Sequence, residues 1–339
     1  MSSGFGKHLK EYLEFYNISQ SEFATRLNIT QKHMNEILNG KTDISLDIAL
    51  AIQNLTDIPV EFIIKSEYKK KIENYLYLKY SEEELKNMLK KRFLIKELEE
   101  REWIKFNNIT NIVQNYIDIF EYLKVRDFEA LDKINEKTLF KKTGDDINKL
   151  SLWIARCDNL SKEQKVEIYI KENFNFLIDD LKKLAYEESI NIEKIQKLLN
   201  CYGIYFVVEK ALTGSKVRGC FKVKMKNPAI YITKNYSGKD SFYYELFHEL
   251  GHCRSDYNEA KSKVIVEGDE KKELRADNFA INTMISKDIW EEIIKDYSEN
   301  NLKLISEKYK IPMSFIVGRL AKLNYIKYTN KLLVKYKEY

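Results

Sequence analysis

Residues that interrupt or crosslink a chain are scarce in this sequence of 339 residues, which has three prolines, eleven glycines and four cysteines. Because proline and glycine disfavour helix interiors, their scarcity predicts a mostly helical protein with short turns. No two cysteines form a C-x-x-C pair, and the closest two, Cys201 and Cys220, are nineteen positions apart. We therefore expect reduced thiols rather than a disulfide framework or a cysteine-based zinc site.

Long apolar runs are also absent. No stretch approaches the roughly eighteen apolar residues of a membrane-spanning helix. The N-terminal sequence MSSGFGKHLKEYLEF lacks the continuous apolar core of a secretion signal. The sequence thus predicts a cytoplasmic protein with no membrane partner. Apolar residues make up 44% of the chain, which favours a globular over a disordered protein, and the net charge of +5 is too small to indicate nucleic acid by itself.

The order of sequence patterns predicts a mainly α protein with a small β-sheet, which is an α+β fold. We expect an N-terminal bundle of short helices at residues 1–68, a helical connecting region at 69–149 and a further domain at 150–339. Runs of β-branched and aromatic residues predict strands within residues 202–210, 219–226 and 229–234. Residues 212–219 and Asn227–Pro228 are expected to separate these strands.

Helix-start and helix-stop residues divide the N-terminal region. A first helix is expected from about Phe5 to Phe15, and Asn39–Gly40 is expected to end a later one. Pro59 suits the first turn of a further helix. The residues placed to cap helix N-termini are Ser19, Thr30 and Ser45. In the middle region, residues 81–102 have many Glu–Lys pairs at helical spacing and predict one solvated amphipathic helix.

Two of the four histidines of the chain lie in the segment ELFHELGHCR. His248 and His252 are four positions apart, so on a helix they lie on one face and can bind one cation together. Glu249 is offset enough to miss the metal and to hold a water molecule beside it. This is the H-E-x-x-H pattern of zinc peptidases, in which zinc activates water and a carboxylate moves its proton. Gly251 is expected to permit close approach of a neighbouring segment.

A third protein ligand has to come from outside this segment, because Ser255 and Asn258 stand where an extended motif would have glycine and histidine. In the segment ELRADNFAINTMI, Glu273 and Asp277 share one helical face. Glu273 is our candidate third ligand, and Asp277 is expected to accept the free N–H of a ligating histidine. The rival ligands are Glu267, Asp269 and Glu270. The alternative is that the two histidines are unrelated surface or core residues.

From about Leu150 to Tyr328 the chain resembles the ImmA/IrrE family of metallopeptidases. The resemblance rests on YGIYFVV, AIYITK, FYYELFHELGH, ELRADNFAINTMIS and ISEKYKIPMSFIVGRLAKLNYI, which occur in the expected order. It implies a zinc-dependent enzyme with His248, His252 and Glu273 as ligands and Glu249 as the base. Some members of the family cleave repressors, so a repressor or an antitoxin is the implied kind of protein substrate.

Residues 6–68 resemble the helix-turn-helix regulators of the XRE class, and the segment ISQSEFATRLNITQKHMNEILNGKTDISLDIALAIQNLTDIPVEFII is close to HigA-type antitoxins. The resemblance implies that operator DNA is a partner, with the third helix in the major groove. The residues expected at base edges are Gln31, Lys32, His33 and Asn35. Gln20 is expected near a phosphate.

The charge of the N-terminal region weighs against strong DNA binding. Residues 1–66 contain six basic and eight acidic residues, a net charge of −2. Because phosphate affinity comes from cationic contacts, we expect binding to require a homodimer. The alternative is a bundle that serves protein interaction or dimerisation.

Three functions are compatible with these patterns. The leading hypothesis is a DNA-binding regulator with a zinc endopeptidase domain that cleaves a partner protein. A second is an antitoxin-like repressor that neutralises a toxin by binding it, with a non-catalytic peptidase-like sensor domain. A third is a peptidase that releases its own DNA-binding domain. The sequence names neither the substrate, the operator nor the activating signal.

Overall fold

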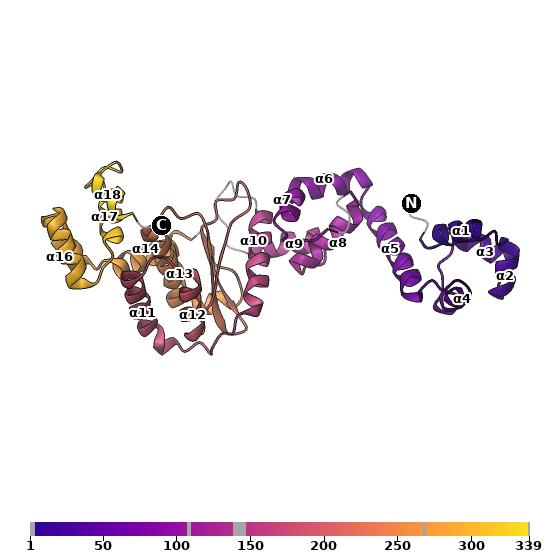
Figure 1. Ribbon diagram of the computed structural model, residues 1–339, viewed down its shortest axis with the longest axis horizontal. Helices are drawn as coiled ribbons and strands as arrows, with labels where there is room; N and C mark the ends of the chain where they lie inside the picture. The colour runs from indigo at the N-terminus through magenta and orange to yellow at the C-terminus, as the bar shows by residue number, and fades with distance from the viewer. Residues whose placement is uncertain (1–3, 107–109, 138–146, 267–268, 338–339) are drawn as a thin grey trace. The chain divides into compact units, whose positions relative to one another are not determined.

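The computed structural model describes residues 4–106, 110–137, 147–266 and 269–337. Most described residues are helical and there is one three-stranded sheet, which confirms the predicted α+β class (Figure 1). The chain divides into two compact units, residues 1–91 with 104–119 and residues 92–103 with 120–339. None of the described helices is long and apolar enough to cross a membrane.

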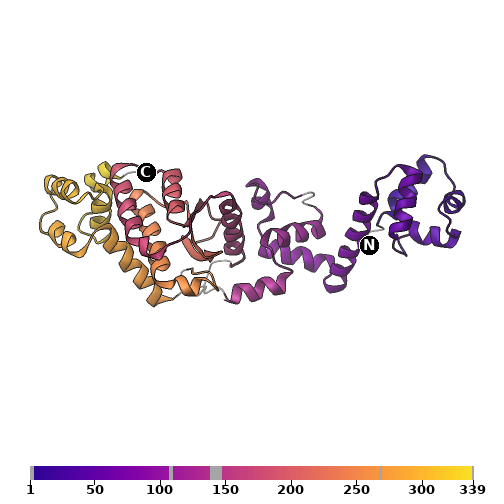
Figure 2. The same cartoon turned by 90° about the horizontal axis from the view of Figure 1, so that it is seen from below.

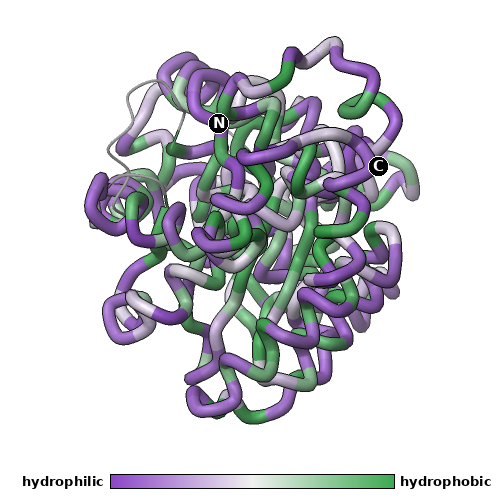
Figure 3. Tube along the Cα trace, turned by 90° about the vertical axis from the view of Figure 1, so that its left-hand side faces the viewer, coloured by the Kyte–Doolittle hydropathy of each residue, from purple (hydrophilic) through white to green (hydrophobic). Residues whose placement is uncertain are grey.

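The regular elements described in the N-terminal half of the chain are all helices. Its helices are α1 (Gly6–Phe15), α2 (Gln20–Arg26), α3 (Gln31–Leu38), α4 (Leu46–Thr56), α5 (Val60–Lys79), α6 (Glu82–Arg92), α7 (Ile95–Glu100), α8 (Ile112–Leu123) and α9 (Phe128–Lys137). Helix α5 is continuous across residue 68, where the sequence predicts a domain boundary. Figure 3 shows hydrophobic and hydrophilic residues alternating along the helices, as expected when one face of each is buried.

The expected helix caps of the N-terminal bundle are largely confirmed. Ser19 accepts a hydrogen bond from the backbone N–H of Glu22, and Thr30 accepts one from His33, both at 3.1 Å. Ser45 occupies an N-cap position but makes no capping bond with its side chain. Pro59 is the residue before α5 rather than a member of its first turn. Around these caps the four short helices and the start of α5 enclose a core that includes Phe5, Leu9, Phe23, Met34 and Ile52.

The prediction of one solvated helix at residues 81–102 is wrong. The segment forms two helices, α6 and α7, with a break at Phe93 and Leu94. Phe93 is 2% exposed and packs against the rings of Phe120 and Phe128. Burial of the Phe93 ring accompanies the break in the helix. The many Glu–Lys pairs of the segment predict a continuous helix and give no sign of this break.

The sheet confirms the three predicted strands, β1 (Tyr205–Glu209), β2 (Gly219–Lys224) and β3 (Asn227–Thr233). Their order is β1-β3-β2, with β1 parallel and β2 antiparallel to β3. Asn227–Pro228 does not separate the last two strands as expected but begins β3, where Pro228 pairs with Val223. The turn lies instead at Met225 and Lys226, which both have positive φ.

Helices surround this sheet (Figures 1 and 2). Helix α13 packs against β2 and β3, while α10 and α12 pack against β1. The helices of this half are α10 (Ile147–Leu160), α11 (Phe174–Glu187), α12 (Ile192–Cys201), α13 (Lys239–Ala260), α14 (Glu270–Met284), α15 (Lys287–Lys295), α16 (Glu299–Tyr309), α17 (Met313–Lys322) and α18 (Lys331–Tyr336), with short 3₁₀ turns at Ser161–Glu163 and Lys171–Asn173. All four cysteines are free.

Candidate metal centre and DNA-binding helices

Helix α13 presents two histidines one turn apart on the same face. His248 is 8% and His252 is 2% exposed, so both imidazoles lie inside the protein. Their Nε2 atoms are 3.2 Å apart. The two imidazoles are close because residues four positions apart lie on the same side of a helix.

Helix α14 lies beside α13 and supplies the third group (Figure 1). The carboxylate of Glu273 lies 3.3 Å from His248 Nε2 and 3.5 Å from His252 Nε2. These three residues each offer one ligand atom, and the three atoms lie within 4.8 Å of one another. The close approach of the two helices depends on Gly251, since a Cβ there would come within 2.9 Å of Ala276 Cα.

The contacts between the three side chains are close to the spacing of ligands around a tetrahedral zinc ion. Zinc bonds of about 2.0–2.1 Å to nitrogen and oxygen place tetrahedral ligand atoms roughly 3.3 Å apart. The two Nε2 atoms are 3.2 Å apart, Glu273 Oε2 lies 3.3 Å from His248 Nε2, and Glu273 Oε1 lies 3.5 Å from His252 Nε2. Glu273 Oε1 is also buried without a hydrogen-bond partner among the described residues. Both observations are compatible with a cation held between the three side chains.

Carboxylates hold the outer nitrogen of each imidazole. His248 Nδ1 lies 2.9 Å from Asp277 Oδ1, which also accepts a hydrogen bond from the Tyr244 hydroxyl at 2.6 Å. His252 Nδ1 lies 2.8 Å from Asp256 Oδ2. Such contacts fix the orientation of a ligating imidazole and leave Nε2 for the metal. The sequence pattern predicts this role for Asp277 but not for Asp256, although Asp256 stands four residues after His252 on the same helix.

Glu249 lies beside the three candidate ligands but is not one of them. It is 5% exposed, and its Oε2 atom has no hydrogen-bond partner among the described residues. Its other oxygen packs against the backbone of Gly219 so closely that any Cβ there would collide with it. Glycine at the start of β2 therefore leaves the space in which this carboxylate lies.

The electrostatics of the cluster favour a positive charge at its centre. Burial raises the pKa of Glu249 to about 7. Burial acts to lower the pKa of His252, but contacts with Asp256 and Glu273 raise it to about 10. Burial also acts against ionisation of Glu273, yet the two histidines lower its pKa to about 2. The carboxylates thus stabilise positive charge on the imidazoles, which is the charge that a metal ion would supply.

The rival third ligands do not join this group in the described part of the chain. Asp269 caps α14 by accepting from the backbone N–H groups of Lys271 and Lys272. Glu270 is in the first turn of α14 but outside the cluster of potential ligands. Glu267 lies outside the described residues.

The candidate DNA-binding residues lie on the two helices expected to form the helix-turn-helix. Gln20 begins α2, and the other four occupy the first five positions of α3. Gln20, Gln31, Lys32 and Asn35 are exposed, whereas His33 is half-buried. The side chain of Asn35 also accepts a hydrogen bond from Asn39 at 2.7 Å. The exposed start of α3 is thus available to a partner, with Asn35 already engaged by one intrahelical bond.

Comparison with known families gives a match to the helix-turn-helix family at residues 9–63. The matched region runs from within α1 to the first turn of α5 and does not include the metal cluster. No curated protein matches the chain. The match supports a DNA-binding transcriptional regulator whose helix-turn-helix lies in the N-terminal unit.

Proposed function

We propose that this regulator is also a zinc-dependent endopeptidase that cleaves a partner protein, such as a repressor or an antitoxin. The convergence of His248, His252 and Glu273 within 4.8 Å, with the buried carboxylate of Glu249 beside them, carries the proposal. The resemblance of residues 150–328 to ImmA/IrrE peptidases rests partly on these same residues, and it is the reason for proposing peptide cleavage rather than metal binding alone.

Each residue of the cluster has a role in this proposal. Zinc, when bound, lowers the pKa of a water molecule to about 7 and polarises a peptide carbonyl. Asp277 and Asp256 orient the two histidines. Glu249 takes a proton from the attacking water and passes it to the departing amine.

The outer edge of β2 is the proposed place for the substrate backbone. On this edge Phe221 exchanges two backbone hydrogen bonds with Ile265, at 2.9 and 2.7 Å. Alternate residues of a strand direct their backbone groups to the same edge, so the N–H and C=O of Gly219 face the same way. Gly219 also contacts Glu249. An extended peptide that pairs with Gly219 would therefore lie next to the proposed base.

The N-terminal unit is proposed to bind operator DNA as a homodimer. Its α3 has the exposed polar residues at its N-terminal end that a recognition helix needs. The net charge of −2 in residues 1–66 limits the affinity of one copy. Two copies on two half-sites would add their contacts and compensate for this weak phosphate attraction.

The same net charge favours a second candidate function, in which the chain neutralises a toxin by binding it. An acidic bundle is better suited to a basic protein than to DNA. In this case the metal cluster serves as a sensor or scaffold. The two candidate functions differ in their dependence on Glu249: cleavage of a partner requires its carboxylate, whereas neutralisation of a toxin by binding does not.

The test compares cleavage of a co-encoded partner by zinc-loaded wild-type chain and by Glu249→Gln. We expect the variant to retain zinc and lose cleavage by about 10²–10⁴-fold, the usual contribution of a general base. Glu291→Gln, an exposed position on α15, is the matched control and should cleave normally. Cleavage that is unchanged in Glu249→Gln would remove the proposed mechanism. Shortening of the chain itself on gels after zinc addition would identify self-cleavage.

A further inference from the structure

The carboxylate that holds His252 is itself held by an arginine. Asp256 contacts His252 Nδ1 with one oxygen, and its other oxygen accepts a hydrogen bond from Arg275 of α14 at 2.9 Å. The Asp256 side chain is 4% exposed, whereas that of Arg275 is 56% exposed. Arg275 therefore reaches a buried carboxylate from the surface of the protein, and this charge-assisted bond restrains the rotation of the carboxylate.

The carboxylate that holds His248 is held by a tyrosine instead. The Tyr244 hydroxyl lies 2.6 Å from Asp277 Oδ1, the same oxygen that lies next to His248 Nδ1. An ionised carboxylate only accepts hydrogen bonds, so the hydroxyl is the donor. The rings of Tyr244 and His248 also lie near each other, with their centroids 6.3 Å apart. Tyr244 thus restrains the carboxylate of Asp277 and packs near the imidazole that this carboxylate holds.

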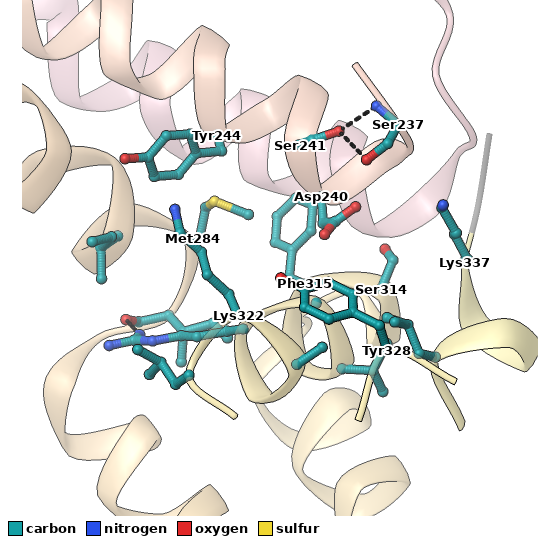
Figure 4. A pocket seen from close by; sticks show the side chains of 18 of the residues that line it. Ser237, Asp240, Ser241, Tyr244, Met284, Ser314, Phe315, Lys322, Tyr328 and Lys337 are labelled. Atoms are coloured by element: carbon teal, nitrogen blue, oxygen red, sulfur yellow. Dashed lines mark hydrogen bonds between the residues drawn. The ribbon is translucent and has the colours of Figure 1, made fainter. Parts of the chain in front are cut away.

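The Tyr244 ring has a further contact of its own. It forms one wall of a pocket of about 350 Å³, whose lining also includes Met284, Ser314 and Lys322 (Figure 4). Lys322 Nζ lies 4.2 Å from the centre of the ring, which is the geometry of a cation–π contact. In Figure 4 the hydroxyl points away from Ser314. The pocket therefore contacts the ring of Tyr244, while its hydroxyl is bonded to Asp277.

We propose that Arg275 and Tyr244 are positioning residues for the candidate zinc ligands, and that they act through Asp256 and Asp277. A ligating imidazole has to direct its Nε2 atom at the metal, and the partner of its outer nitrogen sets that direction. A carboxylate that is free to rotate loses part of this control, so the residue that restrains it should add to the metal affinity. The proposal rests on the metal centre of the proposed function but not on peptide cleavage.

The two positioning residues restrain their carboxylates by different forces. Arg275 is charged and more than half exposed, so salt should weaken its attraction for Asp256. The screening length falls from about 10 Å at 0.1 M salt to about 3 Å at 1 M. Tyr244 is neutral, and its hydrogen bond to Asp277 should depend little on salt. The salt dependence of metal affinity therefore distinguishes the two residues.

The test is a zinc titration of the full chain against a chelator dye, for the wild type, Arg275→Met and Tyr244→Phe. Each variant loses a hydrogen bond to a carboxylate, so we expect the zinc affinity of each to fall about threefold to tenfold. Raising the salt from about 0.1 M to about 1 M should reduce the effect of Arg275→Met and leave that of Tyr244→Phe unchanged. Arg275→Lys keeps the charge and should recover part of the affinity.

The matched controls also lie on α13 and make their contacts away from the metal cluster. Arg254 lies over the ring of Phe279, and Tyr257 donates to the backbone carbonyl of Lys226. We expect Arg254→Met and Tyr257→Phe to bind zinc like the wild type.

Double variants separate positioning from a general effect on the fold. If Arg275 acts through Asp256, then Arg275→Met should change zinc affinity little in a chain that already has Asp256→Asn. The same holds for Tyr244→Phe in a chain with Asp277→Asn. Wild-type zinc affinity in either single variant, or losses that add in full in its double variant, would overturn the proposal for that residue. A wild-type chain that binds no zinc would remove the metal centre itself, and this proposal with it.

Discussion

The two units of this chain place polar residues in opposite environments. In the first unit, the candidate DNA-binding residues at the start of α3 are mostly exposed and rest on an apolar core. In the second, His248, Glu249 and His252 are buried, and carboxylates orient the two histidines. Exposed residues can be substituted one at a time with little effect on their neighbours. In a buried polar cluster, a substitution leaves its partner without a hydrogen bond in a low-dielectric interior, which costs free energy, so the residues depend on one another. The metal cluster should therefore respond more strongly to single substitutions than the recognition helix does.

The largest effect in this comparison is expected for Asp256→Asn. The variant weakens the contact that orients His252, and such partners usually contribute about 10–100-fold to metal affinity. We predict this loss in a zinc titration against a chelator dye, with helix content unchanged by circular dichroism. Glu187→Gln at the exposed end of α11 is the control. Wild-type zinc affinity in Asp256→Asn would show that the carboxylate has no orienting role.

A smaller effect is expected for Gly251→Ala. The added methyl group meets the backbone of α14 at Ala276, which cannot rotate away. Overpacking of this kind costs about 1–3 kcal/mol, so we predict a lower melting temperature for the second unit. Ser255→Ala, exposed on the same helix, should melt like the wild type. If Gly251→Ala melts normally, the two helices are not as closely packed as described.

The smallest effect is expected in the first unit, for Thr30→Ala. This variant removes the side-chain cap of α3, and caps contribute about 1 kcal/mol. We predict slightly weaker DNA binding in a mobility-shift assay, together with unchanged zinc affinity. Ser45→Ala removes a side chain from a cap position that makes no such bond, so it should have less effect. Equal effects from the two variants would contradict the finding that the side chain of Thr30 caps its helix and that of Ser45 does not.

Local spacing predicted much of the fold and of the candidate site. The strands, the caps at Ser19 and Thr30, and the meeting of His248 with His252 follow from regular periods along single elements. Glu273 and Asp277 could be chosen as candidate site residues because they share a helical face. Their contacts with the histidines of α13 depend on tertiary packing, which the spacing alone does not predict.

Features that depend on packing between distant segments were not predictable. The break at Phe93 follows from ring contacts with Phe120 and Phe128. The turn at Met225 and Lys226 contains no residue that favours positive φ, so nothing in the sequence marked it. The pocket around Ser314 is lined by several separate segments, including α13, α14 and α17, and has no counterpart in any one segment.

The most direct test of the central claim is the zinc content of the purified full chain, compared with that of Glu273→Gln, by elemental analysis after dialysis. Because three side chains from two helices converge on one point, we predict one tightly held zinc per wild-type chain and almost none in the variant. A wild-type chain that holds no zinc after exposure to the metal, or equal zinc in both proteins, would contradict the assignment of these residues as a metal centre.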